Sequence, residues 1–342
     1  MPRLRELAPL QTLALALFFG FLVAAPLAEE WLLKLATRMA IFAMAAAALD
    51  LALGVGGMVS FGHAAFLGLG AYVVGIAFVH GFEGSTLAGF EPPADIWRQM
   101  LIAMLAASAF ALVTGWVSLR TRGVAFIMIT LAFAQMLYWF FVSLRRYQGE
   151  DGIALWNRSQ GLFVDLEPQP NFHLFAVLCL LLFTLLALRL YHSRFGRVLR
   201  AARDNERRVS ALGFPIVRFR LVAYGISAAA TAVAGVLLAN ATWFVGPSYL
   251  SWPVSGQLIV MVVLGGMGTI FGPMLGAALF VLLEQFLPDL LDLLEPGAGE
   301  HWKLVLGPLL VLLALRLRRG LFPALARGRP GAGAVLPEVD RG

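Results

Sequence analysis

Charged residues are scarce in this chain of 342 residues: Asp, Glu, Lys and Arg make up 13%, whereas hydrophobic residues make up 60%. Soluble domains carry about 25% charged residues. A chain of this length could bury a large core, but a soluble core needs a charged shell that this composition cannot supply. The composition therefore excludes a soluble globular enzyme and indicates that the apolar surface faces lipid.

Cysteine and lysine are almost missing as well. Cys179 is the single cysteine, which excludes an internal disulfide framework and a cysteine metal cluster. The two lysines, Lys34 and Lys303, do not follow a glycine, so the GxxxxGK[ST] phosphate-binding motif is excluded. We also find no metal-ligand spacing, catalytic triad or redox motif, and we expect no cofactor, no metal and no enzymatic activity. Any ATP chemistry must come from another chain.

Long apolar runs predict an all-α, polytopic membrane bundle of about eight to ten helices, with glycine-broken or re-entrant segments. A membrane helix needs roughly 20 mostly apolar residues. Ten segments are candidates: 11–27, 35–53, 60–79, 96–119, 124–142, 172–190, 221–239, 254–267, 270–287 and 302–315. Segments 254–267 and 270–287 fit either two short crossings or one re-entrant hairpin. We expect one transmembrane domain over residues 1–326 and a disordered cytoplasmic tail over 327–342, which is rich in Gly and Pro.

The placement of arginine predicts the orientation, because positive residues gather in cytoplasmic loops. Ten crossings put four arginine-bearing regions on one side: 3–5, 120–122, 189–220 and 316–329. Both termini are therefore expected in the cytoplasm. The loop 144–171 is an exception, since it falls outside yet carries Arg145, Arg146 and Arg158. Because the arginines adjoin apolar runs, the net charge of +6 indicates topology signals and not nucleic-acid binding.

Two glycine-rich segments are the first functional candidates. Seven glycines lie in residues 54–75, and Gly56-Gly57-Met58-Val59-Ser60 is similar to Gly265-Gly266-Met267-Gly268-Thr269. Interrupted segments at corresponding places in two halves indicate a transporter's substrate path, although tight helix packing or chance similarity would also produce them. The candidate pathway residues are Asp50, Gly56, Gly57, Ser60, His63, Gly265, Gly266 and Thr269.

Asp50 and Glu284 are acidic residues inside predicted spans. A buried acid at lipid depth is costly and is a functional candidate for that reason. Both residues can instead lie near helix ends, where water or hydrogen bonds would satisfy them.

Residues 191–215 form the third candidate. Charged residues recur on one side of this segment, while Leu199, Ala202, Val209 and Leu212 recur on another, which predicts one short amphipathic helix. It could lie on anionic lipid as a topology anchor or fit a groove on a partner protein; the apolar side favours the partner. The candidate docking residues are Arg197, Leu199, Arg200, Ala202, Asp204, Glu206, Leu212 and Gly213.

Four runs of the sequence, in this order, resemble the LivM-like permease subunit of branched-chain amino-acid (LIV-type) ABC importers: LDLALGVGGMVSFGHAAFLGLGAY, LRTRGVAFIMITLAFAQML, GRVLRAARDNERRVSALGF and GGMGTIFGPMLGAALFVLLEQFL. The resemblance implies a permease of the bacterial inner membrane that carries branched-chain amino acids inward. It implies as partners a LivH-like second permease, two cytoplasmic ABC ATPases and a periplasmic solute-binding protein. It also implies that residues 197–213 couple to an ATPase and that residues 56–63 lie near the pathway.

The sequence departs from that family at two positions. Asp50 stands where asparagine is more usual, and Met58 stands where glutamine is frequent. If these positions face the solute, the substrate could be urea, an amide or another small solute.

Two other functions compete with the importer. An ion- or proton-coupled secondary carrier would work without an ATPase and would use Asp50 and Glu284 as coupling acids, but it leaves the amphipathic segment without a role. A membrane enzyme acting on lipid-linked substrates would need a paired acid and base or metal ligands, which we do not find.

Overall fold

The computed structural model describes residues 8–328 except 87–90, 122, 162–164, 296 and 318–319. The predicted tail at 327–342 therefore lies outside the described residues, apart from 327 and 328. The described chain is an all-α membrane bundle, which confirms the predicted fold class. Eight helical segments are long and apolar enough to cross a membrane. They contain α1 (Pro9–Ala24), α2 (Glu30–Asp50), α3 (His63–Glu83), α4 (Ile96–Ser118), α5 (Val124–Ser143), α6 (Gln169–His192), α9 (Ile216–Thr242) and α11 (Gly272–Leu294).

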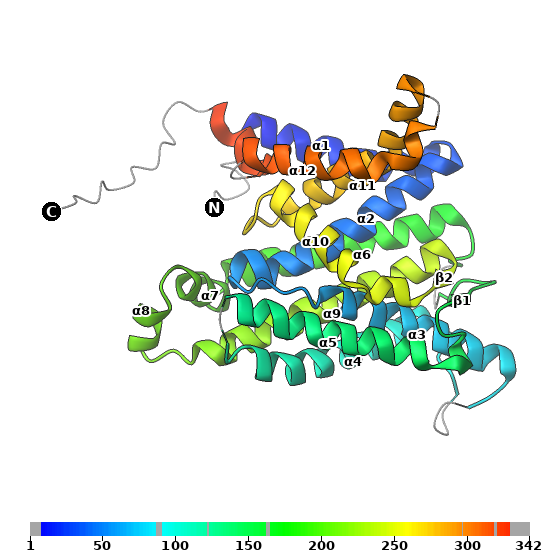
Figure 1. The fold of residues 1–342 in the computed structure, drawn as a ribbon, viewed down its shortest axis with the longest axis horizontal. Coiled ribbons are helices and arrows are strands. Elements are labelled where there is room, and N and C mark those ends of the chain that lie inside the picture. Colours follow the sequence, from blue (N-terminus) through cyan, green and yellow to red (C-terminus); the bar gives the residue numbers. More distant parts are fainter. Residues whose placement is uncertain are drawn as a thin grey trace.

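Shorter elements complete the bundle. The shorter helices are α7 (Arg194–Asp204), α8 (Glu206–Ala211), α10 (Trp252–Gly265), α12 (Trp302–Arg316) and α13 (Leu321–Ala324). Single turns are η2 (Ala25–Leu27), η3 (Leu51–Val55, π-helical), η4 (Arg145–Tyr147), η5 (Pro247–Leu250), η6 (Ala298–His301) and η7 (Leu325–Gly328). Strands β1 (Ile153–Ala154) and β2 (Phe244–Val245) form one antiparallel pair. Figure 1 shows α7 and α8 at one end of the bundle and the strand pair at the opposite end.

The segment pair at 254–287 forms two separate helices. Helix α11 has 23 residues and is long enough to cross on its own. Helix α10 has only 14 residues. It follows η5, whose Leu250 packs against Gly68 of α3. The sequence explains the short helix: Pro247 lies in η5 before α10, Pro253 lies in the first turn of α10, and Gly266 ends the helix. The described chain therefore contains one full helix and one short helix here.

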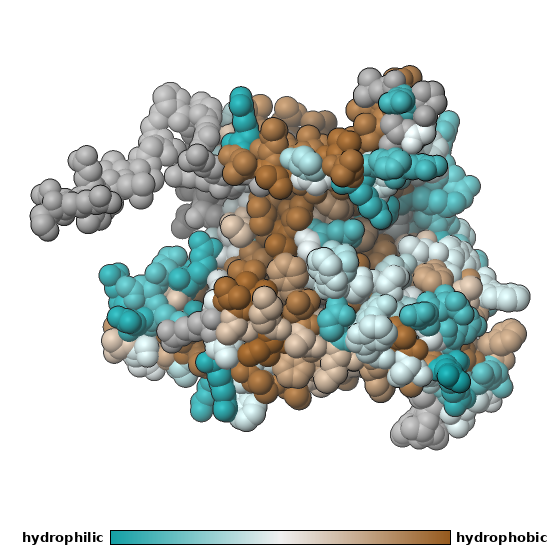
Figure 2. Space-filling model, in the orientation of Figure 1, coloured by the Kyte–Doolittle hydropathy of each residue, from teal (hydrophilic) through white to brown (hydrophobic). Residues whose placement is uncertain are grey.

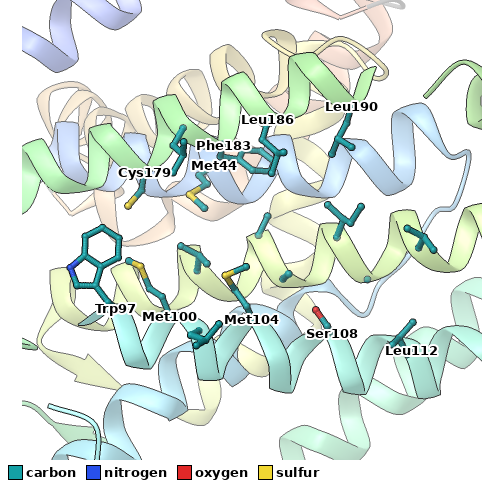
Figure 3. A pocket seen from close by; sticks show the side chains of 18 residues that line it. Met44, Trp97, Met100, Met104, Ser108, Leu112, Cys179, Phe183, Leu186 and Leu190 are labelled. Carbon is teal, nitrogen blue, oxygen red and sulfur yellow. The ribbon is translucent and has the colours of Figure 1, made fainter. Parts of the chain in front are cut away.

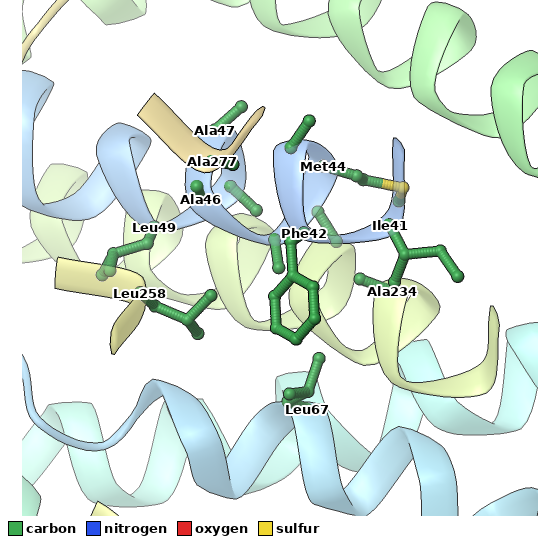
Figure 4. Close-up of a cluster of buried hydrophobic side chains, with 14 of the residues drawn as sticks. Ile41, Phe42, Met44, Ala46, Ala47, Leu49, Leu67, Ala234, Leu258 and Ala277 are labelled. Atoms are coloured by element: carbon green, nitrogen blue, oxygen red, sulfur yellow. The ribbon is translucent and has the colours of Figure 1, made fainter. Parts of the chain in front are cut away.

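Helix α2 forms the centre of the bundle, where it packs against α6, α9, α10 and α11. Its small side chains at 45–48, all alanine, let neighbouring helices approach closely. Figure 4 shows Phe42 and Leu49 of this helix lying near Leu67, Ala234 and Leu258 of three other helices. The buried core is thus built around a helix whose most apolar window is 94% buried within the chain.

Glycines bring α3 and α9 into backbone contact. A Cβ atom added at Gly70 would lie 1.9 Å from the carbonyl oxygen of Ala232. A Cβ added at Gly235 would lie 1.9 Å from the carbonyl oxygen of Leu67. Two reciprocal close contacts of this kind fix how the two helices sit against each other. Part of the glycine content of residues 54–75 therefore serves packing and not a pathway.

The outer surface matches a membrane environment. Figure 2 shows hydrophobic residues across the middle of the molecule and hydrophilic residues concentrated toward the two ends. A groove of about 780 Å³ runs between α4, α6 and α9, and its lining is almost wholly apolar. Figure 3 shows Met100, Met104, Cys179 and Leu186 around this groove. Large apolar side chains exposed on the outer helices are the surface expected to contact lipid.

Two of the three arginines of the exceptional loop 144–171, Arg146 and Arg158, contact other residues at the end of the bundle that carries β1 and β2. Arg146 forms an ion pair of 3.0 Å with Glu83. Arg158 is buried and donates to the carbonyl oxygens of Asn240, Leu166 and Glu167. Burial lowers the pKa of Arg158, and the nearby Glu167 carboxylate opposes this shift. Arg146 and Arg158 are therefore engaged within the chain, which is compatible with the predicted non-cytoplasmic position of this loop.

Candidate functional site

Two glycine-rich helix breaks meet in space: the first break follows α2, and the second break follows α10. Helix α2 continues as the π-turn η3, while α10 ends at Gly265. Asp50 Oδ1 accepts a hydrogen bond of 2.8 Å from the backbone N–H of Gly268. A Cβ added at Gly54 would lie only 2.2 Å from Gly268 N, so the two backbones are in direct contact. We call residues 50–58 and 265–269 together the glycine junction.

Backbone conformation explains why the junction is rich in glycine. Gly57, Gly266 and Gly268 have φ angles of 70°, 118° and 73°. Residues with a side chain rarely adopt such positive φ angles, whereas glycine does so readily. The close approach of α10 to the start of α11 requires glycine at 265, since a Cβ there would lie 1.9 Å from the carbonyl oxygen of Gly272. Thr269 Oγ1 donates to Gly266 O at 2.6 Å and holds the second break in shape. Gly56, which is buried, ends the π-turn.

Ser60 and His63 lie just after the first break, and both are fully buried. Ser60 Oγ accepts from the N–H of Gly62 and lies 3.2 Å from the hydroxyl of Tyr224. His63 Nε2 lies 2.9 Å from Ser227 Oγ, and Ser227 Oγ donates to the carbonyl oxygen of Ala48. Since that hydroxyl proton is used, His63 Nε2 carries the hydrogen and donates it. Both predicted pathway residues therefore hold α3 against α9 and α2.

The beginning of α3 is tied to two further helices. The N–H of Phe61 donates to Thr130 Oγ1 of α5 at 3.2 Å. The N–H of Ala64 donates to Ser255 Oγ of α10 at 2.9 Å. The first N–H groups of a helix have no partner within the helix. Ser255 of α10 satisfies the N–H of Ala64 in the first turn of α3, and Thr130 of α5 binds the N–H of Phe61 just before the helix. A movement of α10 would therefore act on the first break as well as on the second.

Glu284 is paired and not isolated. Its carboxylate lies 2.6 Å from Arg38 Nη2, and this ion pair joins α11 to α2. Both side chains are partly buried. The two acids suggested by the sequence thus have structural partners, Gly268 N for Asp50 and Arg38 for Glu284.

The candidate segment 191–215 contains two helices, α7 and α8, and the prediction of one amphipathic helix is wrong. Asn205 has an extended backbone, and its Oδ1 accepts from the N–H of Arg208 as the N-cap of α8. Ser193 caps α7 in the same way, through the N–H of Gly196. The break arises because asparagine is a strong helix-capping residue, and helical periodicity alone does not reveal it.

Three of the four apolar residues on the predicted apolar side of this segment are buried in the chain itself, so these three do not face a partner as predicted. Leu199, Ala202 and Val209 are all at most 4% exposed, and the last two pack with Ile216. Leu212 is different, because it is 70% exposed. The amphipathic pattern was real, but its apolar side covers the base of the bundle.

The predicted polar docking residues also fall into two groups, those engaged within the chain and those that are exposed. Arg200 donates to the carbonyl oxygens of Gly196 and Tyr191 and stacks on the Tyr191 ring. Glu206 forms an ion pair of 3.0 Å with Arg220 of α9. In contrast, Arg197, Asp204 and Gly213 are exposed.

An outward surface remains on α7 and α8. It surrounds a shallow groove of about 510 Å³. We call this surface the outer face, and it consists of Arg194, Arg197, Ala201, Leu212 and Phe214. The exposure of Leu212 and Phe214 beside two arginines gives this face an apolar centre with positive charge around it.

Comparison with known proteins identifies the family. A family model described as the permease component of the branched-chain amino acid transport system matches residues 31–314. The chain belongs to this permease family. The resemblance seen in the four sequence runs is thereby confirmed.

Relatives of this permease support the same assignment. It is 28% identical over 335 residues to the branched-chain amino acid permease protein LivM of Escherichia coli K12, covering 91% of this chain and 73% of LivM. It is 26% identical over 301 residues to BraD of Pseudomonas aeruginosa, covering 84% of this chain and 92% of BraD. It is also 31% identical over 148 residues to LivH of E. coli K12, covering 43% and 44%. No solved structure gives a significant match.

Several residues of this permease site escaped prediction from the sequence. They are Arg38, Thr130, Arg203, Tyr224, Ser227 and Ser255. A polar side chain inside an apolar run is the signal that could have found most of them. Arg203 carries no such signal, because it lies among other arginines in the polar segment 191–215.

Proposed function

We propose that this chain is one permease subunit of an ATP-binding-cassette importer in a bacterial inner membrane. It carries branched-chain amino acids, or a related small polar solute, inward. The family match and the names of the relatives support the class of transport. The observation that carries the proposal is a contact between α7 and the glycine junction, in which Arg203 Nη1 of α7 donates to the carbonyl oxygen of Gly54. An ATP-driven permease needs a physical link of this kind between its ATPase-docking segment and its membrane helices.

The proposed partners follow from the likeness to two kinds of permease protein. Matches to LivM and to LivH proteins support a multi-subunit transporter with a paired, LivH-like permease. Two cytoplasmic ATPases supply the phosphate-binding motif that this chain lacks, and a periplasmic solute-binding protein delivers the solute.

The proposed orientation places α7 and α8 in the cytoplasm. The described C-terminal segment lies at the same end of the bundle as α7 (Figure 1). Gln11 Nε2 near the start of α1 donates to the carbonyl oxygen of Phe322, so the two ends of the described chain meet. This arrangement supports cytoplasmic termini on the side that is rich in arginine.

The candidate pathway residues act in two groups in this proposal. Asp50, Gly56, Gly57, Gly265, Gly266 and Thr269 form the flexible junction between broken helices. Ser60 and His63 hold the beginning of α3 so that the junction and α3 move together. The chain thereby changes the solute route by rearranging helix ends, without these side chains needing to touch the solute.

Docking of an ATPase on the outer face gives the first test. Leu212→Asp puts a carboxylate into the exposed apolar centre and is expected to reduce co-purification of the ATPase subunits, while the permease keeps its melting temperature. Leu199→Asp buries an unpaired charge in the permease itself, at a cost of several kcal/mol. This second variant is expected to lower the melting temperature. The measurement is pull-down of the ATPases together with thermal unfolding of each variant in detergent.

The two leucines control for each other, because the substitution is the same and only the burial differs. Undiminished ATPase binding by a normally folded Leu212→Asp permease would contradict docking at the outer face. A Leu199→Asp permease with unchanged melting temperature would contradict the burial of the apolar side.

A further inference from the structure

One arginine side chain connects α7 to both glycine breaks. Arg203 is the second-to-last residue of α7, and its Nη1 donates to the carbonyl oxygen of Gly54. Its side-chain stem lies against Gly57, where an added Cβ would be 2.8 Å from Arg203 Cγ. A Cβ added at Gly268 would be 3.0 Å from Arg203 Nη1. The side chain thus reaches from the cytoplasmic segment to residues on either side of the junction.

The carbonyl oxygen that Arg203 binds is one that the helix break leaves open. The N–H groups of Gly56, Gly57 and Met58 donate to Leu51, Leu53 and Ala52, so none of them donates to Gly54 O. Helix ends require outside donors for such carbonyl groups. Arg203 supplies the donor from a different element. The conformation of the first break therefore depends on where α7 lies.

We propose that Arg203 is the positioning residue that transmits movement of the α7 and α8 segment to the glycine junction. The proposal rests on the proposed function, because it takes ATPase docking as the source of the movement. When the segment shifts, Arg203 moves Gly54 and presses on Gly57, and the Asp50 contact carries the change to Gly268. Glycine at 57, 266 and 268 lets the backbone respond at little steric cost.

The test uses the assembled transporter in proteoliposomes, with its second permease, ATPases and binding protein. Arg203→Met keeps a long stem but removes the donor, while Arg203→Lys restores one donor. Arg207→Met makes the same charge change on α8, at an exposed position. We expect Arg203→Met to bind the ATPases and hydrolyse ATP normally but to lower solute uptake per ATP by about tenfold, an effect within the range for residues on a coupling route. Arg203→Lys is expected to recover most of the loss, and Arg207→Met is expected to match the wild type.

A second measurement reports on the junction itself. Met267 is exposed within the second break. Cys179 is the single cysteine of the chain, so Met267→Cys in a Cys179→Ala background gives this chain a single labelling site, which is followed on the separated permease band. We expect the maleimide labelling rate at this site to change between nucleotide-free and ATP-trapped transporter. That change is expected to vanish with Arg203→Met and to persist with Arg207→Met.

The outcomes separate the two proposals. Unchanged uptake per ATP in Arg203→Met, or a nucleotide-dependent labelling change that persists in it, overturns the role of Arg203. If the unmutated chain fails to bind the ATPases or to show ATP-driven uptake, the proposed function itself is overturned. If Arg203→Met does not insert, loss of the labelling change in Arg203→Lys would overturn the role, because the lysine keeps a donor.

Discussion

Replacing Asp50 by leucine is expected to reduce transport by at least about tenfold, whereas replacing it by asparagine is expected to leave most transport intact. Leucine has a similar shape but leaves the N–H of Gly268 without an acceptor, which costs about 1–3 kcal/mol when the group is buried. Asparagine keeps an Oδ1 atom that can accept the same hydrogen bond. Uptake by the reconstituted transporter, with membrane insertion measured in parallel, checks both variants.

The same pair of variants separates the importer from a proton-coupled carrier. A carrier that uses Asp50 to bind a proton must lose transport in both variants, because neither leucine nor asparagine can take up and release a proton. In the proposed importer Asp50 acts through a hydrogen bond to the second glycine break. Loss of transport in Asp50→Asn, in a chain that inserts normally, would therefore favour the carrier.

The second large effect concerns the contact between α3 and α9. Gly235→Ala is expected to destabilise the permease by about 1–3 kcal/mol, the usual cost of overpacking a well-packed core. The added Cβ would lie 1.9 Å from the carbonyl oxygen of Leu67, and a backbone atom cannot move aside as a side-chain tip can. The change is measured as a lower melting temperature in detergent.

Gly225 of the same helix gives a matched control. A Cβ added there meets its nearest atom, Leu112 Cδ2, at 3.9 Å, which is ordinary contact. Gly225→Ala is therefore expected to leave stability unchanged or to raise it, because alanine favours helix more than glycine does. Equal melting temperatures for the two variants would contradict the close packing of α3 on α9.

The bundle could be predicted from the sequence because length and hydropathy decide whether a helix can cross a membrane. The break between 254–267 and 270–287 was also visible, since glycine and proline interrupt the apolar run there. That Asp50 meets Gly268 was not visible, although both segments were singled out. Contact between residues separated by 218 positions depends on how the helices pack, and one sequence carries no direct signal of it.

The segment 191–215 shows a different limit of prediction from sequence. Its periodicity correctly indicated an apolar side, yet periodicity does not tell whether that side meets a partner or the chain's own bundle. Burial of Leu199 and exposure of Leu212 settle the matter for those residues. Asn205 ends one helix and caps the next, which is a local hydrogen-bonding effect that a pattern of apolar residues does not record.

The central claim is that this chain carries solute inward only when separate ATPases drive it. The most direct measurement is uptake of labelled leucine, isoleucine or valine into proteoliposomes that contain the chain, its paired permease and its ATPases, with binding protein outside and ATP inside. Uptake is expected to require the ATPases and ATP and to persist when a protonophore collapses the proton gradient. Uptake by the chain alone, driven by a proton or sodium gradient without any ATPase, would contradict the claim.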